Sequence, residues 1–128
     1  MSYHISRTVS GDFDDVVART TQALKDEGFG VLTEIDVKKT LKSKIDVDFR
    51  PYLILGACNP GLAHRALSAE DKVGVLLPCN VVVQDKGAEG IEISAMDPAA
   101  AMSMIDNAEV REVAVTVRDK LAKVVDAV

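Results

Sequence analysis

The chain has 128 residues, of which 48% are hydrophobic and 27% are charged, and its formal net charge is −5. This length and mixture predict one soluble globular domain over residues 1–128 and argue against a disordered chain. The negative charge disfavours nucleic acid and anionic membranes as partners, because both reward positive charge. Aromatic residues make up only 4%, and Trp is absent, so the core has to be built from aliphatic side chains.

The low number of cysteines and the short apolar runs predict the cellular compartment of the protein. The first residues turn polar at once, which is not typical of a secretory signal, and no run approaches the roughly 18 apolar residues of a membrane span. Two cysteines are too few for the disulfide framework of a small secreted protein. We therefore expect a cytoplasmic protein in which Cys58 and Cys79 are free thiols.

The N-terminal elements are predicted from two different periodicities. Apolar and polar residues alternate over residues 3–9, which predicts a strand, although Arg7 interrupts the apolar positions. Residues 12–27 show helical spacing, with Asp12 as the N-cap. Gly28 is predicted to end this helix as the residue after its C-cap.

Next come a strand, a short helix and a second strand. Residues 29–35 are rich in strand-forming residues, and Asp36 is placed to cap a short helix over 37–42 whose exposed side is basic. Residues 52–55 form a continuous apolar run, which is typical of a strand buried on both faces or at a subunit contact. Asn59-Pro60 is an N-cap and first-turn pair that opens another helix.

The C-terminal part predicts two more strands and two helices. The strands are expected over 75–84 and 90–96, and Asp97-Pro98 repeats the cap-then-proline signal at the start of a short helix over 98–104. Apolar residues over 110–128 fall on one helical face. Strands grouped between two long helices predict an α+β fold, with helices packed on one face of a mainly antiparallel sheet.

Such a sheet leaves its second face in need of a partner or of a polar surface. Alternation within 75–84 is poor, since Leu76, Leu77 and residues 81–83 include apolar neighbours. Both faces of that strand are therefore expected to be buried, which predicts a homodimer.

Two motifs in the middle of the chain resemble a known family. Ala57-Cys58-Asn59-Pro60 and Leu77-Pro78-Cys79-Asn80 resemble motifs of the domain-of-unknown-function family 302, and the similarity runs from about residue 3 to the C-terminus. The resemblance implies a TATA-box-binding-protein-like β-α-β(4)-α arrangement and commonly a homodimer, and it implies no established activity. Similarity to the fold of a DNA-binding protein does not transfer that function.

The two cysteines are the main candidates for chemistry. Cys58 directly precedes a predicted helix, whose free amide groups favour an anion and so could lower the pKa of its thiol. If the strand ending at Cys58 pairs antiparallel with the strand beginning near Leu77, Cys58 and Cys79 approach each other. The alternatives are that both are buried as small hydrophobes, a common fate of free cysteines, or that they hold a metal.

Metal and cofactor signals are weak. His64 lies six residues after Cys58 and therefore off the same helical face, His4 is distant, and no C-x-x-C or H-x-x-x-H spacing occurs. We predict no metal and no cofactor, and an exposed His64. Glu34, set in an apolar strand, is a candidate general base, with an outward-facing strand residue as the alternative.

These observations leave two hypotheses. In the first, the protein binds a small molecule or uses a reactive thiol pair at a site near a dimer interface. In the second, it is a non-catalytic structural or interaction homodimer, and its cysteines serve packing. Whether it is an enzyme stays open. The candidate site residues are Cys58, Asn59, Pro60, Pro78, Cys79, Asn80 and Glu34.

Overall fold

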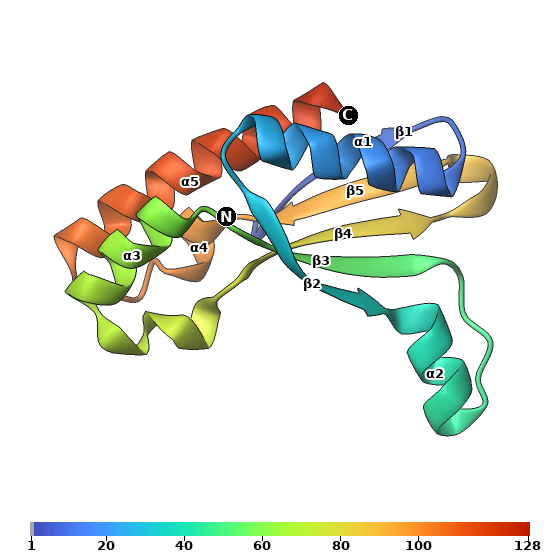
Figure 1. Cartoon of the computed structure of the whole chain (residues 1–128), viewed down its shortest axis with the longest axis horizontal. Coiled ribbons are helices and arrows are strands. Elements are labelled where there is room, and N and C mark those ends of the chain that lie inside the picture. The colour runs from blue at the N-terminus through green and yellow to red at the C-terminus, as the bar shows by residue number, and fades with distance from the viewer. Residues whose placement is uncertain (1) are drawn as a thin grey trace.

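The computed structural model describes residues 2–128 as an α+β fold (Figure 1). Five antiparallel strands form one sheet in the order β1-β5-β4-β3-β2, with helices packed on it, which confirms the predicted fold class. The strands are β1 (His4–Val9), β2 (Gly30–Asp36), β3 (Tyr52–Cys58), β4 (Cys79–Asp85) and β5 (Ile91–Met96). The helices are α1 (Phe13–Asp26), α2 (Val37–Ile45), α3 (Pro60–Ala69), α4 (Pro98–Ala101) and α5 (Ala108–Ala127), with 3-10 turns η1 (Asp71–Leu76) and η2 (Gly87–Glu89).

The core lies between one face of the sheet and the helices α1 and α5, which cross it side by side (Figure 1). Successive strand residues point to opposite faces, so alternate positions such as Leu55, Val83 and Ile93 are buried beneath the helices. Leu24 of α1 and Leu121 of α5 are fully buried against them. By contrast, α2 projects from the body and contains no fully buried residue. Within residues 2–128, no helix combines the length and apolar character needed to cross a membrane.

The apolar run at 52–55 was predicted to be buried on both faces or to lie at a subunit contact, and within this chain only one of its faces is buried. In β3, Leu53 and Leu55 are buried, whereas Tyr52 and Ile54 are only partly covered. The strand therefore has one core face and one face outside the helical layer. The sequence pattern indicated two buried faces because the residues on the less covered face, Tyr52 and Ile54, are apolar as well.

The predicted strand over 75–84 begins later than expected. Asp71–Leu76 forms η1, and β4 starts at Cys79 after a short link. From there the strand alternates normally, with Val81 and Val83 buried. The apolar neighbours Leu76 and Leu77 belong to the turn and the link, so the argument that both faces of this strand need a partner does not hold.

The predicted helix starts are confirmed by side-chain capping, which satisfies amide groups that lack helical partners. A side-chain oxygen accepts from a backbone amide at Asp12, Asp36, Asn59 and Asp97. Helix ends are less well predicted. The short helix after Asp36 extends to Ile45, and the helix after Asp97 already ends at Ala101. The last helix begins at Ala108, with Asn107 as its N-cap.

Arg7, which interrupts the apolar pattern of β1, serves the end of α5. Its Nη1 atom donates hydrogen bonds to the carbonyl oxygens of Asp126 at 2.6 Å and Val128 at 3.0 Å. Carbonyl groups in the last turn of a helix lack helical partners and carry partial negative charge. The guanidinium therefore stabilises that helix end from a position on the core side of the edge strand.

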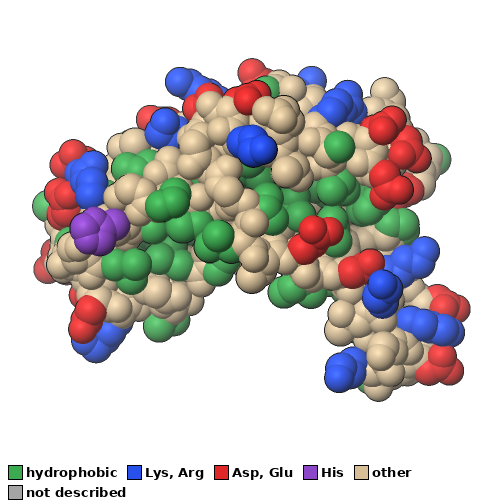
Figure 2. Space-filling model, in the orientation of Figure 1, with side chains coloured by type: hydrophobic (Ala, Val, Ile, Leu, Met, Phe, Trp, Pro, Cys, Tyr) green, Lys and Arg blue, Asp and Glu red, His purple; other side chains and the backbone are tan. Residues whose placement is uncertain are grey.

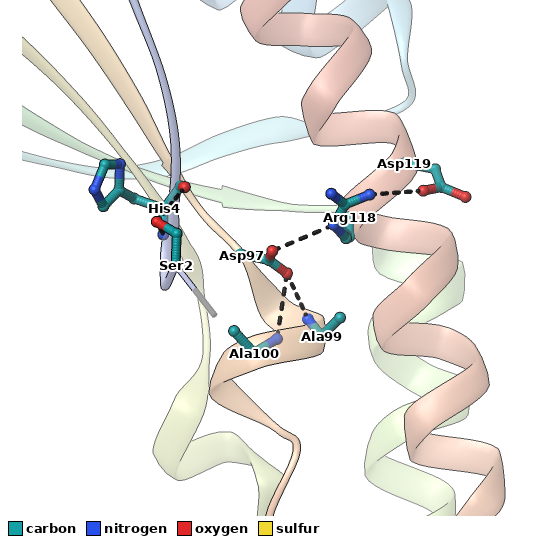
Figure 3. Close-up of polar contacts among 7 residues, drawn as sticks. All are labelled: Ser2, His4, Asp97, Ala99, Ala100, Arg118 and Asp119. Atoms are coloured by element: carbon teal, nitrogen blue, oxygen red, sulfur yellow. Dashed lines mark hydrogen bonds and ion pairs between the residues drawn. The ribbon is translucent and has the colours of Figure 1, made fainter.

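Asp97 joins the end of β5 to both C-terminal helices (Figure 3). One carboxylate oxygen accepts from the amides of Ala99 and Ala100 at 3.0 and 3.2 Å. The other accepts from Nε of Arg118 on α5 at 3.2 Å. The Asp97 amide donates to the carbonyl of Tyr3 at 2.8 Å. This buried carboxylate thus fixes α4 between the sheet and α5.

Candidate functional site

A pocket of about 400 Å³ opens where the sheet ends beside α3 and α5. The ends of β3 and β4 form its floor, α3 and η1 one side, and α5 with the residues around α4 its inner wall. Phe29 and Leu32 close it from the β2 side. Figure 2 shows hydrophobic side chains gathered over this part of the surface. At the mouth, the Leu32 side chain is 67% exposed and the Leu67 side chain 41% exposed.

The pocket lining is almost wholly apolar. Its walls come mainly from Leu, Val, Ala, Pro and Met side chains, and within residues 2–128 it includes no Asp, Glu, Lys, Arg or His. The polar groups that reach it are the two thiols, Asn59 and Thr33. A charged ligand group would lose hydration here without gaining a partner. The arrangement therefore suits an uncharged, mainly apolar molecule.

The two cysteines meet at this pocket. β3 and β4 pair antiparallel, with Ala57 opposite Cys79, so Cys58 follows the residue that faces Cys79. Both cysteines line the pocket, and both are free thiols. The antiparallel pairing on which their approach depended is thus present in the structure.

The two thiols differ in their surroundings. Cys79 is 6% exposed, whereas Cys58 is only partly buried. Burial, with a smaller contribution from the charge of Cys58, raises the pKa of the Cys79 thiol to about 11. Desolvation disfavours the thiolate, so Cys79 stays protonated at neutral pH. Because the thiolate is the nucleophile, Cys79 is poorly suited to attack a ligand and Cys58 is the better placed of the two.

Asn59 and Pro78 also line the pocket, each with a structural task. The side-chain oxygen of Asn59 accepts from the Leu62 amide at 3.2 Å, which caps α3. Pro78 packs beside Gly56, where an added Cβ would lie 2.9 Å from its Cγ and would also collide with Thr33 Oγ1. Gly56 therefore leaves room for the side chains of Thr33 and Pro78 on either side of β3.

The other candidate residues lie outside the pocket. Pro60 is the exposed first residue of α3, Asn80 is exposed on the opposite face of the sheet, and Glu34 is exposed on β2. His64 is exposed on α3. Among residues 2–128, no group of three or more His, Cys, Asp or Glu side chains is arranged to hold a metal ion.

Sequence reasoning missed most of the pocket wall. Leu62 and Ala66 were recognised only as an apolar helical stripe, and Val113 and Val117 only as a core face. Apolar stripes that pack against each other and stripes that leave a hollow have the same spacing in the sequence. The small residues Ala57 and Ala63 were the available signal, because small side chains leave room for a ligand.

Comparison with known proteins supports the resemblance. The family described as "Domain of unknown function DUF302" matches residues 5–128. A crystal structure of an uncharacterized conserved protein DUF302 from Bacillus stearothermophilus is 32% identical, with a TM-score of 0.91 over 99% of this chain and 98% of that chain. No curated protein matches. With both Cys-Asn motifs and the whole pocket inside the matched range, the chain belongs to the DUF302 family.

Proposed function

We propose that the chain binds a small, uncharged and mainly apolar molecule in the pocket beside α3, and that Cys58 is the reactive thiol that meets it. The observation that carries the proposal is the lining, in which two thiols are set among apolar side chains and residues 2–128 contribute no carboxylate, amine or imidazole. A volume of about 400 Å³ lies within the usual range for small-molecule sites. Partly exposed Leu32 and Leu67 at the mouth extend the apolar contact outward.

The two cysteines have separate tasks in this proposal. Cys79 acts as part of the wall, because its buried thiol stays neutral at physiological pH. Cys58 lies at the end of β3, next to Asn59, which opens α3. It is also the more accessible of the two thiols, so a reagent or ligand in the pocket can reach it.

Binding is tested with Nile red, a neutral dye whose emission rises in apolar surroundings. Ala63→Phe places a large side chain in the pocket, while Ala18→Phe adds the same bulk on the exposed side of α1. We expect the wild type and Ala18→Phe to bind the dye alike. Ala63→Phe is expected to bind roughly tenfold more weakly, which corresponds to about 1.4 kcal/mol. Equal binding by all three proteins would contradict the proposal.

The role of Cys58 is tested by alkylation with N-ethylmaleimide and peptide mass analysis. We expect modification of Cys58 before Cys79, and slower modification of Cys58 when Nile red occupies the pocket. Melting temperature monitors folding in each sample. If both cysteines react only after denaturation, Cys58 is not the reactive thiol, although the pocket could still be a binding site.

A non-catalytic homodimer is the second candidate function, and a specific surface favours it. The outer edge of β2 pairs with no strand in residues 2–128. The strand exposes Leu32, which lines the pocket, and Ile35 further along. Exposed edge strands with apolar side chains are surfaces that a second chain can cover. Such a contact would place the pocket near a dimer interface. A single species of 13.7 kDa in sedimentation at micromolar concentration would rule it out.

A further inference from the structure

The uncovered face of the sheet carries a connected row of polar side chains. Register places Ser6 of β1 opposite Ser94 of β5, and Glu92 of β5 opposite Gln84 of β4. These four residues lie on the side of the strands opposite the buried positions Val83 and Ile93. The face beyond the helices is thus polar over β1, β5 and β4.

Hydrogen bonds hold this row in place across three strands. His4 Nδ1 and Ser6 Oγ lie 2.7 Å apart, as do the Oγ atoms of Ser6 and Ser94. The Glu92 carboxylate accepts from Ser94 Oγ at 3.5 Å and from Gln84 Nε2 at 3.3 Å. The side chains are therefore fixed before any ligand arrives, which reduces the entropy that binding would lose.

A hollow of about 400 Å³ lies over Gln84, Glu92 and Ser94 of this row, and within residues 2–128 it shares no lining residue with the apolar pocket. Tyr3 and Tyr52, the two tyrosines of the chain, line it together with His4. Figure 3 shows His4 pointing away from α5, on the uncovered side. The exposed carboxamide of Asn80 and the half-buried side chain of Val82 also line it.

We propose that this hollow is a second binding site, and that it takes a neutral saccharide. A sugar ring presents hydroxyl groups that both donate and accept, together with apolar C–H faces. The hollow offers matching groups: a carboxylate acceptor in Glu92, the exposed amide of Asn80, and tyrosine rings with an apolar body and a polar tip. The Gln84 amide keeps one N–H for a ligand, since its oxygen accepts from Arg50 Nε at 2.9 Å. A few placed polar groups within apolar surroundings are what orient a small ligand.

The charges of the hollow favour a neutral ligand over an ion. Glu92 is the acidic residue of the lining, and its carboxylate already pairs with Lys86 Nζ at 3.5 Å. An anionic ligand would approach this carboxylate unfavourably, and a cationic ligand would have to compete with the lysine. Neutral hydroxyl groups meet neither obstacle, because they exchange hydrogen bonds with water for hydrogen bonds with the protein.

The chain provides its own reporter for the test. It contains no Trp and two Tyr residues, both in the hollow, so intrinsic tyrosine fluorescence reports on this site. Cellobiose, maltose and N,N′-diacetylchitobiose are each titrated to millimolar concentration. We expect a saturable change in tyrosine emission with at least one of them. Amide shift changes in the NMR spectrum should centre on Asn80, Gln84 and Glu92.

Two variants separate this site from a general solvent effect. Asn80→Ala removes an exposed amide of the hollow and is expected to weaken the effective sugar roughly tenfold, about 1.4 kcal/mol. Gln22→Ala removes an exposed amide on α1 and should leave sugar binding unchanged. No saturable change with any of the three sugars, or an equal response in Asn80→Ala, would overturn the proposal. Nile red binding should be unaltered in Asn80→Ala, so the two sites are judged separately.

Discussion

Gly56 of β3 lies between two crowding side chains, Thr33 of β2 and Pro78 just before β4. A Cβ at this position would collide with Thr33 Oγ1 on one side and lie 2.9 Å from Pro78 Cγ on the other. The sequence showed only a glycine between Leu55 and the Ala-Cys-Asn-Pro motif, and nothing in that motif reveals which residues of the adjacent strands lie beside it. Spatial neighbours of this kind are set by register, which a single sequence does not specify.

This packing predicts a clear difference between two glycines. Gly56→Ala is expected to lower the free energy of unfolding by about 1–3 kcal/mol, because the side chains of Thr33 and Pro78 must move. At Gly30, which also lies in the sheet, an added Cβ has nothing within 4 Å. Gly30→Ala should therefore change stability by less than about 1 kcal/mol. Urea unfolding measures both, and equal losses would contradict the packing argument.

The raised pKa of the Cys79 thiol predicts that the stability of the folded protein depends on pH in the alkaline range. Its pKa is about 11 in the folded protein against an ordinary value of 9.0, so between these values the unfolded chain binds fewer protons than the folded chain. Stability then falls as pH rises. We expect the wild type to lose on the order of 2 kcal/mol relative to Cys79→Ala as pH rises from about 9 to 11.

Urea unfolding of both proteins at several pH values measures this difference. Below about pH 8 the thiol is protonated in both states, so the difference between the two proteins should be constant there. A constant difference up to pH 11 would show that the Cys79 thiol is not desolvated.

At the scale of elements, helix starts were predicted better than strand starts. A cap and the residue after it lie side by side in the sequence, so Asp97-Pro98 identifies the start of α4 directly. The start of β4 depends instead on its pairing with β3, which residues 71–78 do not reveal. Their apolar side chains belong to η1 and to the wall of the pocket. Buried and exposed residues do not alternate there as they do in a strand.

Asp97 links three elements, and its loss should destabilise more than a cap alone. Asp97→Ala removes the acceptor for the amides of α4 and the partner of Arg118, and we expect a loss of about 1–3 kcal/mol. Asp119 also contacts Arg118, at 3.4 Å, but is exposed. Asp119→Ala should cost less than about 0.5 kcal/mol. Thermal unfolding of the two variants would refute the linking role if their losses were alike.

At the scale of the whole molecule, the candidate site could be predicted only in part. Cys58, Asn59, Pro78 and Cys79 were expected together because two similar motifs flank one helix, and the structure places all four at one pocket. Asn80 points to the other face because the side chains of a strand alternate. Glu34 lies on the exposed edge strand rather than in a cleft. The motifs thus indicated a place in the fold, while the faces of the strands decided which residues reach it.

The same arrangement predicts what a second copy would cover. On the β2 edge, Leu32 lines the pocket and is more exposed, at 67%, than Ile35 further along the strand. Leu32→Glu places a charge on this surface, where a dimer would have to bury it without a partner. If the chain dimerises along β2, the variant should sediment near 13.7 kDa at concentrations where the wild type has twice that mass.

Val115 offers the matched control, since it is 50% exposed on α5, away from β2. Val115→Glu adds the same charge without touching the β2 edge, so it should leave the wild-type mass unchanged. Loss of the dimer in both variants would place the contact on α5 or show a general effect of charge. Retention of the dimer in both would move the interface away from the pocket mouth, and ligand entry would then be independent of assembly.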